Sequence, residues 1–282
     1  MRTRILIVCG PTASGKSARA IDIAELEGGV IINADAMQVY RELRVLTARP
    51  SVKDEQQVPH ALYGVLDAAD SCSAAKWLAL ARIAIDKALT AGKLPIVTGG
   101  TGLYIKALMQ GLSPIPDIAP QIRAQATALW QERADKALAE YDPLMGAQLK
   151  PGDSQRHTRA LEVMLATGKS LAHWKQLPRQ KAYPDADFTI EYCDVAREEL
   201  YRRCNARFLA MLEAGAVEEV RALHALGLSS TLPAMRAVGV GELIAHLNGK
   251  WTLDEATKHA QQATRNYAKR QVTWFTHQLA TS

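Results

Sequence analysis

The residues best suited to chemistry in this chain form a glycine-rich segment near the N-terminus. The segment matches the pattern G-x-x-x-x-G-K-[ST] and follows a short apolar run, Ile5–Cys9. In such a loop, glycines let backbone N–H groups turn inward around phosphate oxygens, the lysine neutralises charge, and the last hydroxyl can hold Mg²⁺. The pattern therefore predicts a P-loop that binds a diphosphate, with Ser17 as the metal ligand. Its residues are Gly10, Pro11, Thr12, Ala13, Ser14, Gly15, Lys16 and Ser17.

A carboxylate follows the second apolar run of the chain. Val30–Asp35 reads as a buried strand that ends in the carboxylate of Asp35. A carboxylate there could coordinate Mg²⁺, act as a general base or cap the next helix. Its position one strand away from the predicted P-loop favours the two functional readings.

The third apolar run, Leu94–Thr98, continues into a glycine turn that carries Thr101. An ordinary P-loop ATPase would place a metal-binding aspartate at the end of this strand. A threonine hydroxyl can hydrogen-bond a polar substrate, but it cannot replace a carboxylate at a metal. The pattern counts against a hydrolytic motor and leaves a small-molecule P-loop kinase open as an alternative.

Other polar and aromatic residues give weaker signals. The arginines of the C-terminal third are read as solvated helix faces, the isolated histidines as structural, and the tryptophans as core. The residues concerned are Arg197, Arg202, Arg203 and Arg207; His60, His157 and His173; and Trp251 and Trp274.

Strands alternate with helices in the first third of the chain. Helical spacing over Lys16–Glu27 and Ala74–Ala91 separates the three apolar runs. This alternation predicts an α/β fold, a P-loop NTPase-like parallel sheet whose ligands lie at the carboxyl ends of the strands. The predicted P-loop, Asp35 and Thr101 all fall at such ends.

The pattern changes near Pro114–Pro116. Residues 117–167 read as helix, 173–184 as a basic loop, and Phe188–Cys193 as a further strand. We therefore expect residues 117–185 to form a helical insertion in a core made of residues 1–116 and 186–282. Helices are predicted at the end of the chain, over Arg197–Glu213, Ala216–Leu226, Val238–Leu247 and from Leu253 onward, the last with a Thr252–Glu255 capping box.

Composition sets broad limits. The 282 residues are 48% hydrophobic and 22% charged, and the net charge of +5 permits a polyanionic partner without requiring one. The four cysteines form no C-x-x-C pair, which argues against a zinc site and a disulfide framework. The sequence contains no apolar run of about 18 residues, and the apolar start is too short for a signal peptide, so a cytoplasmic protein without a membrane span is expected.

Several segments together resemble one family, the tRNA dimethylallyltransferases or isopentenyl-tRNA transferases. The segments follow the family's order and reach the last helix. They are GPTASGKS, NADAMQVY, GGTGLY, the arginine of Gln121-Ile-Arg123, DSQRHTRALEV, PAMRAVG and ATRNYAKRQVTWF.

The resemblance implies that the P-loop holds dimethylallyl diphosphate. The acceptor would be N6 of the adenosine 3′-adjacent to the anticodon, in tRNAs that read codons beginning with U. The family's fold is a P-loop core with a helical insertion that clamps the anticodon stem-loop. Because N6 lies in a stacked loop, the adenosine would be flipped out of the stack.

The same resemblance assigns roles to individual residues. Asp35 matches the catalytic base, and Thr101 would bond near N6 or the departing oxygen. Lys16, Mg²⁺ on Ser17, Arg123 and Arg236 would stabilise charge on the diphosphate. Residues that match tRNA-contacting stretches are Asp35, Ala36, Met37, Gln38, Thr101, Arg123, Thr158, Arg159, Ala160, Leu161, Glu162, Arg265, Lys269 and Arg270.

The chain departs from the family pattern at three points. Thr158 stands where the family commonly has glutamine, and Val240-Gly241-Glu242 replaces the usual Tyr-Arg-Gln. The second change removes an arginine and puts in doubt the contribution of that loop to tRNA binding. The zinc finger of eukaryotic relatives is not expected here, which suits a bacterial type of enzyme that acts as a monomer. A protein that only binds RNA and uses the P-loop as a nucleotide switch remains a further alternative.

Overall fold

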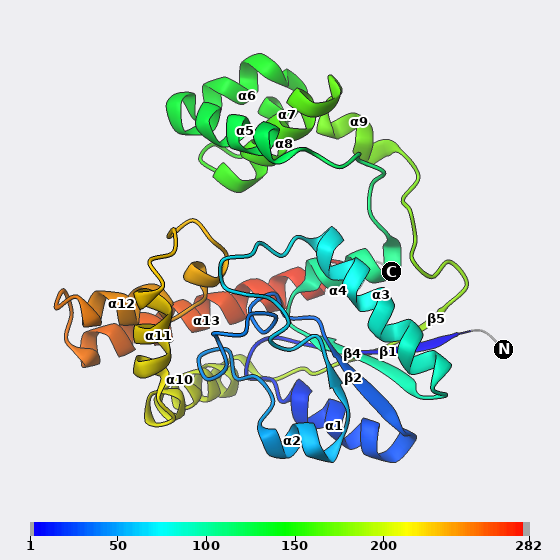
Figure 1. Cartoon of the computed structure of the whole chain (residues 1–282), viewed down its shortest axis with the longest axis vertical. Coiled ribbons are helices and arrows are strands. Elements are labelled where there is room, and N and C mark those ends of the chain that lie inside the picture. The colour runs from blue at the N-terminus through cyan, green and yellow to red at the C-terminus, as the bar shows by residue number, and fades with distance from the viewer. Residues whose placement is uncertain (1–2, 279–282) are drawn as a thin grey trace. The chain divides into compact units, whose positions relative to one another are not determined.

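The computed structural model describes residues 3–278 and consists of two compact units (Figure 1). Unit 1 comprises residues 1–109 and 182–282, and unit 2 comprises residues 110–181. Each unit has its own hydrophobic core and is described by itself.

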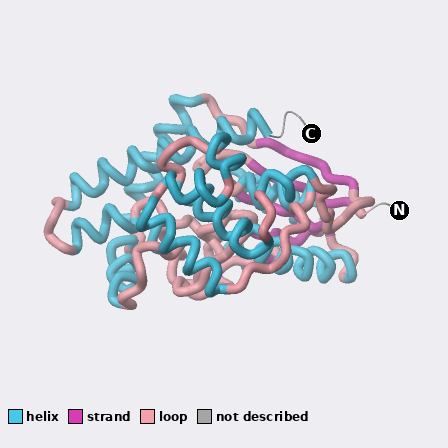
Figure 2. The backbone as a smooth tube through the Cα atoms, turned by 90° about the horizontal axis from the view of Figure 1, so that it is seen from above, coloured by secondary structure: helices cyan, strands magenta, loops and turns pink. Residues whose placement is uncertain are grey.

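A five-stranded parallel sheet organises unit 1, in the order β3-β2-β4-β1-β5. Figure 2 shows the strands running side by side with helices around them. The strand β1, which lies between β4 and β5, is buried from its second residue to its last, as expected for a parallel sheet covered on both faces. The strands are β1 (Arg4–Cys9), β2 (Gly29–Asn33), β3 (His60–Ala61), β4 (Leu94–Gly99) and β5 (Asp187–Tyr192).

Helices cover the two faces of this sheet. Helix α1 (Lys16–Glu27) packs on one face, where Leu6 and Val8 of β1 meet Ala20 and Ile23. Helix α3 (Ala74–Thr90) packs near β2 and β4, and its buried Trp77 donates from Nε1 to the carbonyl of Asn33 at 2.8 Å. In Figure 1, α1 and α3 lie on opposite sides of the strands. This doubly wound arrangement confirms the predicted P-loop NTPase-like α/β class.

The C-terminal helices form a further layer of unit 1. The long helix α13 (Leu253–Gln278) packs against α10 (Arg197–Glu213) and α12 (Val240–Leu247). Its predicted capping box is confirmed, since the Thr252 N–H donates to the Glu255 carboxylate at 2.8 Å and the Glu255 N–H donates to Thr252 Oγ1 at 3.2 Å. The remaining helices of this layer are α11 (Ala216–Ala225) and the short 3₁₀ turn η1 (Ala234–Arg236).

Unit 2 consists of helices around a small core. Its helices are α5 (Pro120–Arg133), α6 (Asp135–Tyr141), α7 (Pro143–Gln148), α8 (Ser154–Thr167) and α9 (Leu171–Gln176). The buried carboxylate of Asp142 holds two of them, because it accepts from the Met145 N–H at 3.2 Å and from Ser170 Oγ at 2.9 Å. The two connecting segments pair at Leu112 and Gln180, whose backbones exchange hydrogen bonds of 2.9 and 3.2 Å.

The structure corrects several boundaries. The expected basic loop over 173–184 begins inside α9, because the Ser170 hydroxyl caps that helix and Leu171 is buried. The second strand ends at Asn33, two residues before Asp35. Three short elements were not expected: α2 (Val52–Gln57), β3 and α4 (Gly102–Gln110). Among the described residues, none of the helices is long and apolar enough to cross a membrane.

Candidate active site

The P-loop joins β1 to α1 and turns sharply at two glycines. Gly10 has φ 156° and Gly15 has φ 91°, both in the region that favours glycine. A Cβ on Gly10 would also lie 2.8 Å from the carbonyl oxygen of Cys193 and 2.9 Å from Ser14 Oγ. The loop therefore packs closely against Cys193, directly after β5, and against its own Ser14 side chain.

Polar groups in and beside the P-loop lack protein partners. The buried hydroxyls of Ser14 and of Thr98, at the end of the adjacent strand β4, have no hydrogen-bond partner. Buried polar atoms are normally satisfied, so these two hydroxyls indicate a place for a polar ligand.

Lys16 is the P-loop cation. Its Nζ donates to the Pro11 carbonyl at 3.3 Å. Burial lowers the pKa of Lys16 to about 8, while the nearby Asp35 carboxylate opposes that shift and the nearby Arg207 guanidinium adds to it. The charges of Asp35 and Arg207 therefore lie near enough to Lys16 to affect its protonation.

Asp35 is held in a tight turn at the carboxyl end of β2. Its backbone N–H donates to Asn33 Oδ1 at 2.8 Å, and Asn33 Nδ2 donates to the Asp35 carbonyl at 3.0 Å. Its carboxylate oxygen Oδ1 accepts from the Met37 N–H at 2.9 Å. The side chain thus acts as a local cap and, with its other oxygen, keeps an acceptor available for a substrate proton.

Thr101 lies beside the Asp35 turn. Its Oγ1 accepts from the Ala36 N–H at 2.9 Å, and its backbone N–H donates to the Ala34 carbonyl at 3.2 Å. A Cβ on Gly99 would lie 2.2 Å from the Ala34 carbonyl carbon, so only glycine allows the two loops to approach this closely. The structure therefore brings the P-loop, Asp35 and Thr101 together, as their places at strand ends predict.

Three residues of the C-terminal helices also belong to this site, and the sequence did not single out their roles. Arg207 of α10 donates to Thr12 Oγ1 of the P-loop, and burial lowers the pKa of this guanidinium. Gln271 of α13 bonds the P-loop and the glycine turn after β4. The Tyr267 hydroxyl lies beside Thr101 and Asp35, and burial, the largest cause, raises the pKa of this phenol. The sequence pattern places Arg207 in a cluster of arginines typical of a solvated helix face. No signal in the sequence separates it from Arg202 and Arg203, which pair with Glu199 in the structure.

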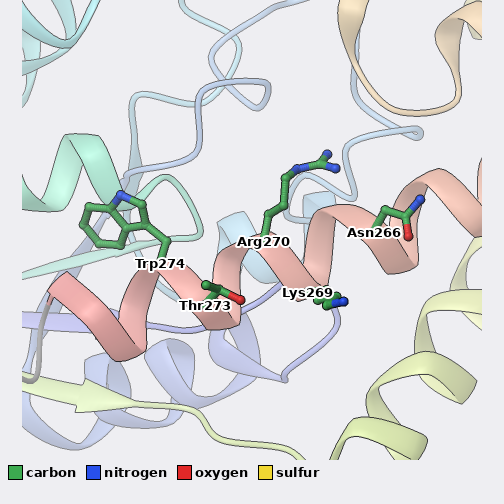
Figure 3. Close-up of a pocket in the computed structure, with 5 residues that line it drawn as sticks. All are labelled: Asn266, Lys269, Arg270, Thr273 and Trp274. Carbon is green, nitrogen blue, oxygen red and sulfur yellow. The ribbon is translucent and has the colours of Figure 1, made fainter. Parts of the chain in front are cut away.

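The cations predicted on α13 have different surroundings. Arg265 is engaged internally, because its guanidinium donates to Asn205 Oδ1 and to Gln262 Oε1. Lys269 is exposed, and the Arg270 guanidinium lies 5.8 Å from the centre of the Tyr267 ring. Figure 3 shows Arg270 and Trp274 projecting from the same side of α13.

Arg236 lies in a separate hollow of about 410 Å³ on unit 1. None of the residues that line it belongs to the P-loop; they include Gly241, Glu242 and Trp251. Glu242 accepts from the Gly239 N–H at 3.0 Å as the N-terminal cap of α12. Because glutamate and glutamine serve equally at this capping position, the departure at Glu242 keeps the local fold, while Gly241 leaves open the space of the missing arginine side chain.

The segment after Asp35 is held by hydrogen bonds among its own residues. Nε2 of Gln38 donates to the carbonyls of Thr47 and Ala48, at 2.9 and 3.0 Å. Ala36 and Met37, like Gln38, are half-buried, and their backbone N–H groups already donate to Thr101 Oγ1 and to Asp35 Oδ1. The side-chain oxygen of Gln38 remains as an acceptor for the predicted contact with tRNA.

The remaining predicted residues lie in unit 2. Arg123 of α5 donates from Nε to the Ile118 carbonyl at 3.2 Å, and Arg159 of α8 pairs with Glu162 at 2.8 Å. Ala160 and Leu161 are fully buried in the core of unit 2, so their side chains cannot contact tRNA as the sequence motif suggested. The roles proposed for the other residues of this unit stay predictions; these residues are Arg123, Thr158, Arg159 and Glu162.

The described residues contain no group of three or more His, Cys, Asp or Glu side chains that could hold a metal ion. Mg²⁺ is nonetheless often held by few protein groups together with the phosphates of a substrate. Ser17, at the start of α1, is exposed. Its hydroxyl therefore suits a Mg²⁺ ion that arrives with a diphosphate.

The fold and the site define the class of this protein. It is a P-loop α/β protein with a carboxylate and a threonine hydroxyl beside the phosphate loop. The family model for IPP transferase matches residues 38–278, and that for isopentenyl transferase matches residues 3–63. A tRNA dimethylallyltransferase of Rhodospirillum centenum is 52% identical over 280 residues, which cover 98% of this chain and 89% of the relative. The chain therefore belongs to the IPP transferase family.

Solved structures agree with this assignment. The full-length tRNA isopentenylpyrophosphate transferase of Bacillus halodurans is similar with a TM-score of 0.68 and 30% identity, over 98% of this chain and 87% of that chain. A eukaryotic dimethylallyltransferase acting on tRNA is similar with a TM-score of 0.82 and 25% identity, over 97% of this chain and 70% of that chain.

Proposed function

We propose that this protein is a tRNA dimethylallyltransferase, which transfers the dimethylallyl group of dimethylallyl diphosphate to N6 of an adenosine in tRNA. The observation that carries the proposal is the meeting of the P-loop, Asp35 and Thr101 at one edge of the sheet, in a member of the IPP transferase family. The small-molecule kinase alternative is not favoured by relatives about half identical to the chain that carry the transferase name.

The proposed reaction forms one bond and breaks one bond. The N6 amino group attacks C1 of the allyl group, the C1–O bond breaks, and its electron pair leaves with the diphosphate. The N6 proton passes to the free oxygen of the Asp35 carboxylate, which is the general base. Thr101 supports this arrangement, because its hydroxyl oxygen already holds the backbone next to Asp35.

The leaving group needs positive charge where the negative charge develops. Lys16 and the P-loop N–H groups would hold the diphosphate, and Arg207 would add a second cation through its contact with Thr12. Arg123 and Arg236 are further candidates for the diphosphate that the sequence motifs suggest. Mg²⁺ on Ser17 would supply charge neutralisation of the phosphate oxygens when bound.

The acceptor is proposed to be the adenosine 3′-adjacent to the anticodon, in tRNAs reading codons that begin with U. Unit 2 would grip the anticodon stem-loop with Thr158, Arg159 and Glu162, and α13 would contact backbone phosphates with Lys269 and Arg270, with Arg265 bracing the helix. The flipped base would enter the site from the stacked loop. We further propose that the enzyme acts as a monomer in the cytoplasm.

The test is an incubation of the purified chain with unmodified tRNA and either dimethylallyl diphosphate or ATP. Prenylated adenosine together with released diphosphate is the expected result, read by nucleoside analysis. ADP with a phosphorylated metabolite would support a kinase, and tight tRNA binding without product from either donor would support an RNA-binding switch. Nucleoside analysis of tRNA from cells with and without the gene would identify the modified position.

A further inference from the structure

Gln271 has a buried side-chain amide whose oxygen and nitrogen both form hydrogen bonds to active-site loops. The side chain comes from α13, and the residue is 5% exposed. Its Oε1 accepts from the Thr12 N–H of the P-loop at 2.8 Å, and its Nε2 donates to the Gly100 carbonyl at 2.8 Å. One side chain therefore connects the loop after β1 to the loop after β4.

The two loops it joins have different tasks in the proposed reaction. The P-loop holds the diphosphate donor, and the turn from Gly100 to Thr101 lies beside Asp35, where the acceptor amino group reacts. Each loop also has hydrogen bonds of its own, such as Ser14 N–H to the Pro11 carbonyl at 3.2 Å and Thr101 N–H to the Ala34 carbonyl at 3.2 Å. Within the described residues, the Gln271 side chain forms a hydrogen bond to each of the two loops and so links them.

We propose that Gln271 is a positioning residue that fixes the distance between the donor site on the P-loop and the acceptor site at Thr101. The inference rests on the proposed function. Because each loop keeps its own bonds, loss of the bridge would leave the binding of either substrate largely intact. The chemical step would suffer instead, since small errors in the placement of two reactants are costly.

The close packing around the amide supports this role. A Cβ on Gly100 would lie 2.2 Å from Gln271 Nε2, so glycine is needed for the amide to reach the backbone. A shorter or apolar side chain at position 271 would leave the buried Gly100 carbonyl and the partly buried Thr12 N–H without these partners.

The test compares Gln271→Met with Gln261→Met in the full chain, using dimethylallyl diphosphate and unmodified tRNA. Gln261 is a matched control on the same helix, because it is a half-buried glutamine with one bond, to the Asn205 carbonyl at 3.2 Å. We expect kcat of Gln271→Met to fall about 10- to 100-fold with either KM within about threefold of wild type. The control should keep the wild-type kcat.

A second variant separates positioning from stability. The protonated carboxyl of Gln271→Glu can both accept from Thr12 and donate to Gly100, whereas the ionised form can only accept. The ratio of its kcat to that of wild type should therefore rise as pH falls, and thermal melting should show both variants folded.

Three results would overturn the proposal: a wild-type kcat in Gln271→Met, a fall confined to substrate affinity, or a kcat ratio for Gln271→Glu that does not change with pH. A wild-type chain that gives no prenylated tRNA would instead contradict the proposed function. The two failures are therefore distinguishable.

Discussion

Asp35 and Lys16 show how one side chain can serve both structure and chemistry. The Asp35 carboxylate caps its own turn through the Met37 N–H, and Lys16 bonds the Pro11 carbonyl. Of the three readings that the sequence left open for Asp35, the helix cap is replaced by a cap of its own turn, since no helix follows it. The general base is compatible with this geometry, and the metal ligand stays a prediction. A substitution must therefore preserve the cap if it is to test the base.

Asp35→Asn satisfies that condition, because the amide oxygen can still accept from Met37. We expect kcat to fall at least about 10²-fold, since the amide cannot take the N6 proton, while tRNA binding stays near wild type. Single-turnover assays and filter binding measure the two quantities. Asp22→Asn, an exposed carboxylate on α1, is the control; near-normal turnover of Asp35→Asn would remove Asp35 as the base.

The lowered pKa of Lys16 predicts a pH dependence of donor binding. Because burial brings this pKa down to about 8, the ammonium of the free enzyme loses its proton as pH rises through that value. The KM for dimethylallyl diphosphate should then increase above pH 8, and the KM of a Lys16→Met variant should be high at every pH. A wild-type KM that stays flat between pH 7 and pH 9.5 (about the range to scan) would contradict this assignment.

At the scale of elements, the loop after β2 is held from a helix far away in sequence. Glu219, in the first turn of α11, accepts from the backbone N–H groups of Arg44, Val45 and Leu46 at 2.7, 2.7 and 2.8 Å. Charge-assisted bonds of this kind are stronger than neutral ones. The carboxylate therefore fixes residues 44–46, directly before the Thr47 and Ala48 carbonyls that hold the Gln38 amide.

Glu219→Gln should loosen this segment, because the amide offers one acceptor oxygen in place of two. We expect a loss of about 2 kcal/mol in the free energy of unfolding and a higher KM for tRNA, with the KM for the donor unchanged. Denaturant unfolding and steady-state kinetics measure these effects. Glu218→Gln, on the exposed neighbour, should behave as wild type; equal behaviour of both variants would show that the loop does not depend on Glu219.

At the scale of the molecule, the chain divides into a unit that contains the P-loop, Asp35 and Thr101 and a helical unit with its own core. The segments entering and leaving unit 2 pair at Leu112 and Gln180, so their ends lie close together. Unit 2 can therefore be removed without pulling the rest of the chain apart.

Replacement of residues 113–179 by a linker of about four residues should leave unit 1 folded, since a short turn suffices to close a bonded pair. Affinity for the anticodon stem-loop should fall at least about 100-fold through lost phosphate contacts. Donor binding should persist through the P-loop, Lys16 and Arg207 of unit 1, weakened only by the loss of Arg123. Calorimetry with each ligand measures this split. Unchanged tRNA affinity in a cooperatively melting variant would show that unit 2 does not hold the tRNA.

Much of this protein could be read from local sequence. The P-loop, the main strands and the long helices have strong periodic patterns and turn residues, and their bounds agree with the structure to within one or two residues for most elements. The short elements α2, β3 and α4 were missed because pieces of two to nine residues carry little periodic signal. The second half of α9 falls in the stretch 173–184, whose basic residues and prolines predict a loop, whereas its cap, Ser170, lies before that stretch.

The sequence by itself determined that Gly10–Ser17, Asp35 and Thr101 would meet, because parallel strands bring their carboxyl ends to one edge. Only the tertiary structure decided which residues of distant helices complete that edge. Arg207, Tyr267 and Gln271 are separated from the P-loop by about two hundred residues or more of chain, and nothing in their local pattern distinguishes them from other helical positions. Their roles arise from the packing of α10 and α13 in unit 1, which depends on long-range contacts that no local sequence pattern encodes.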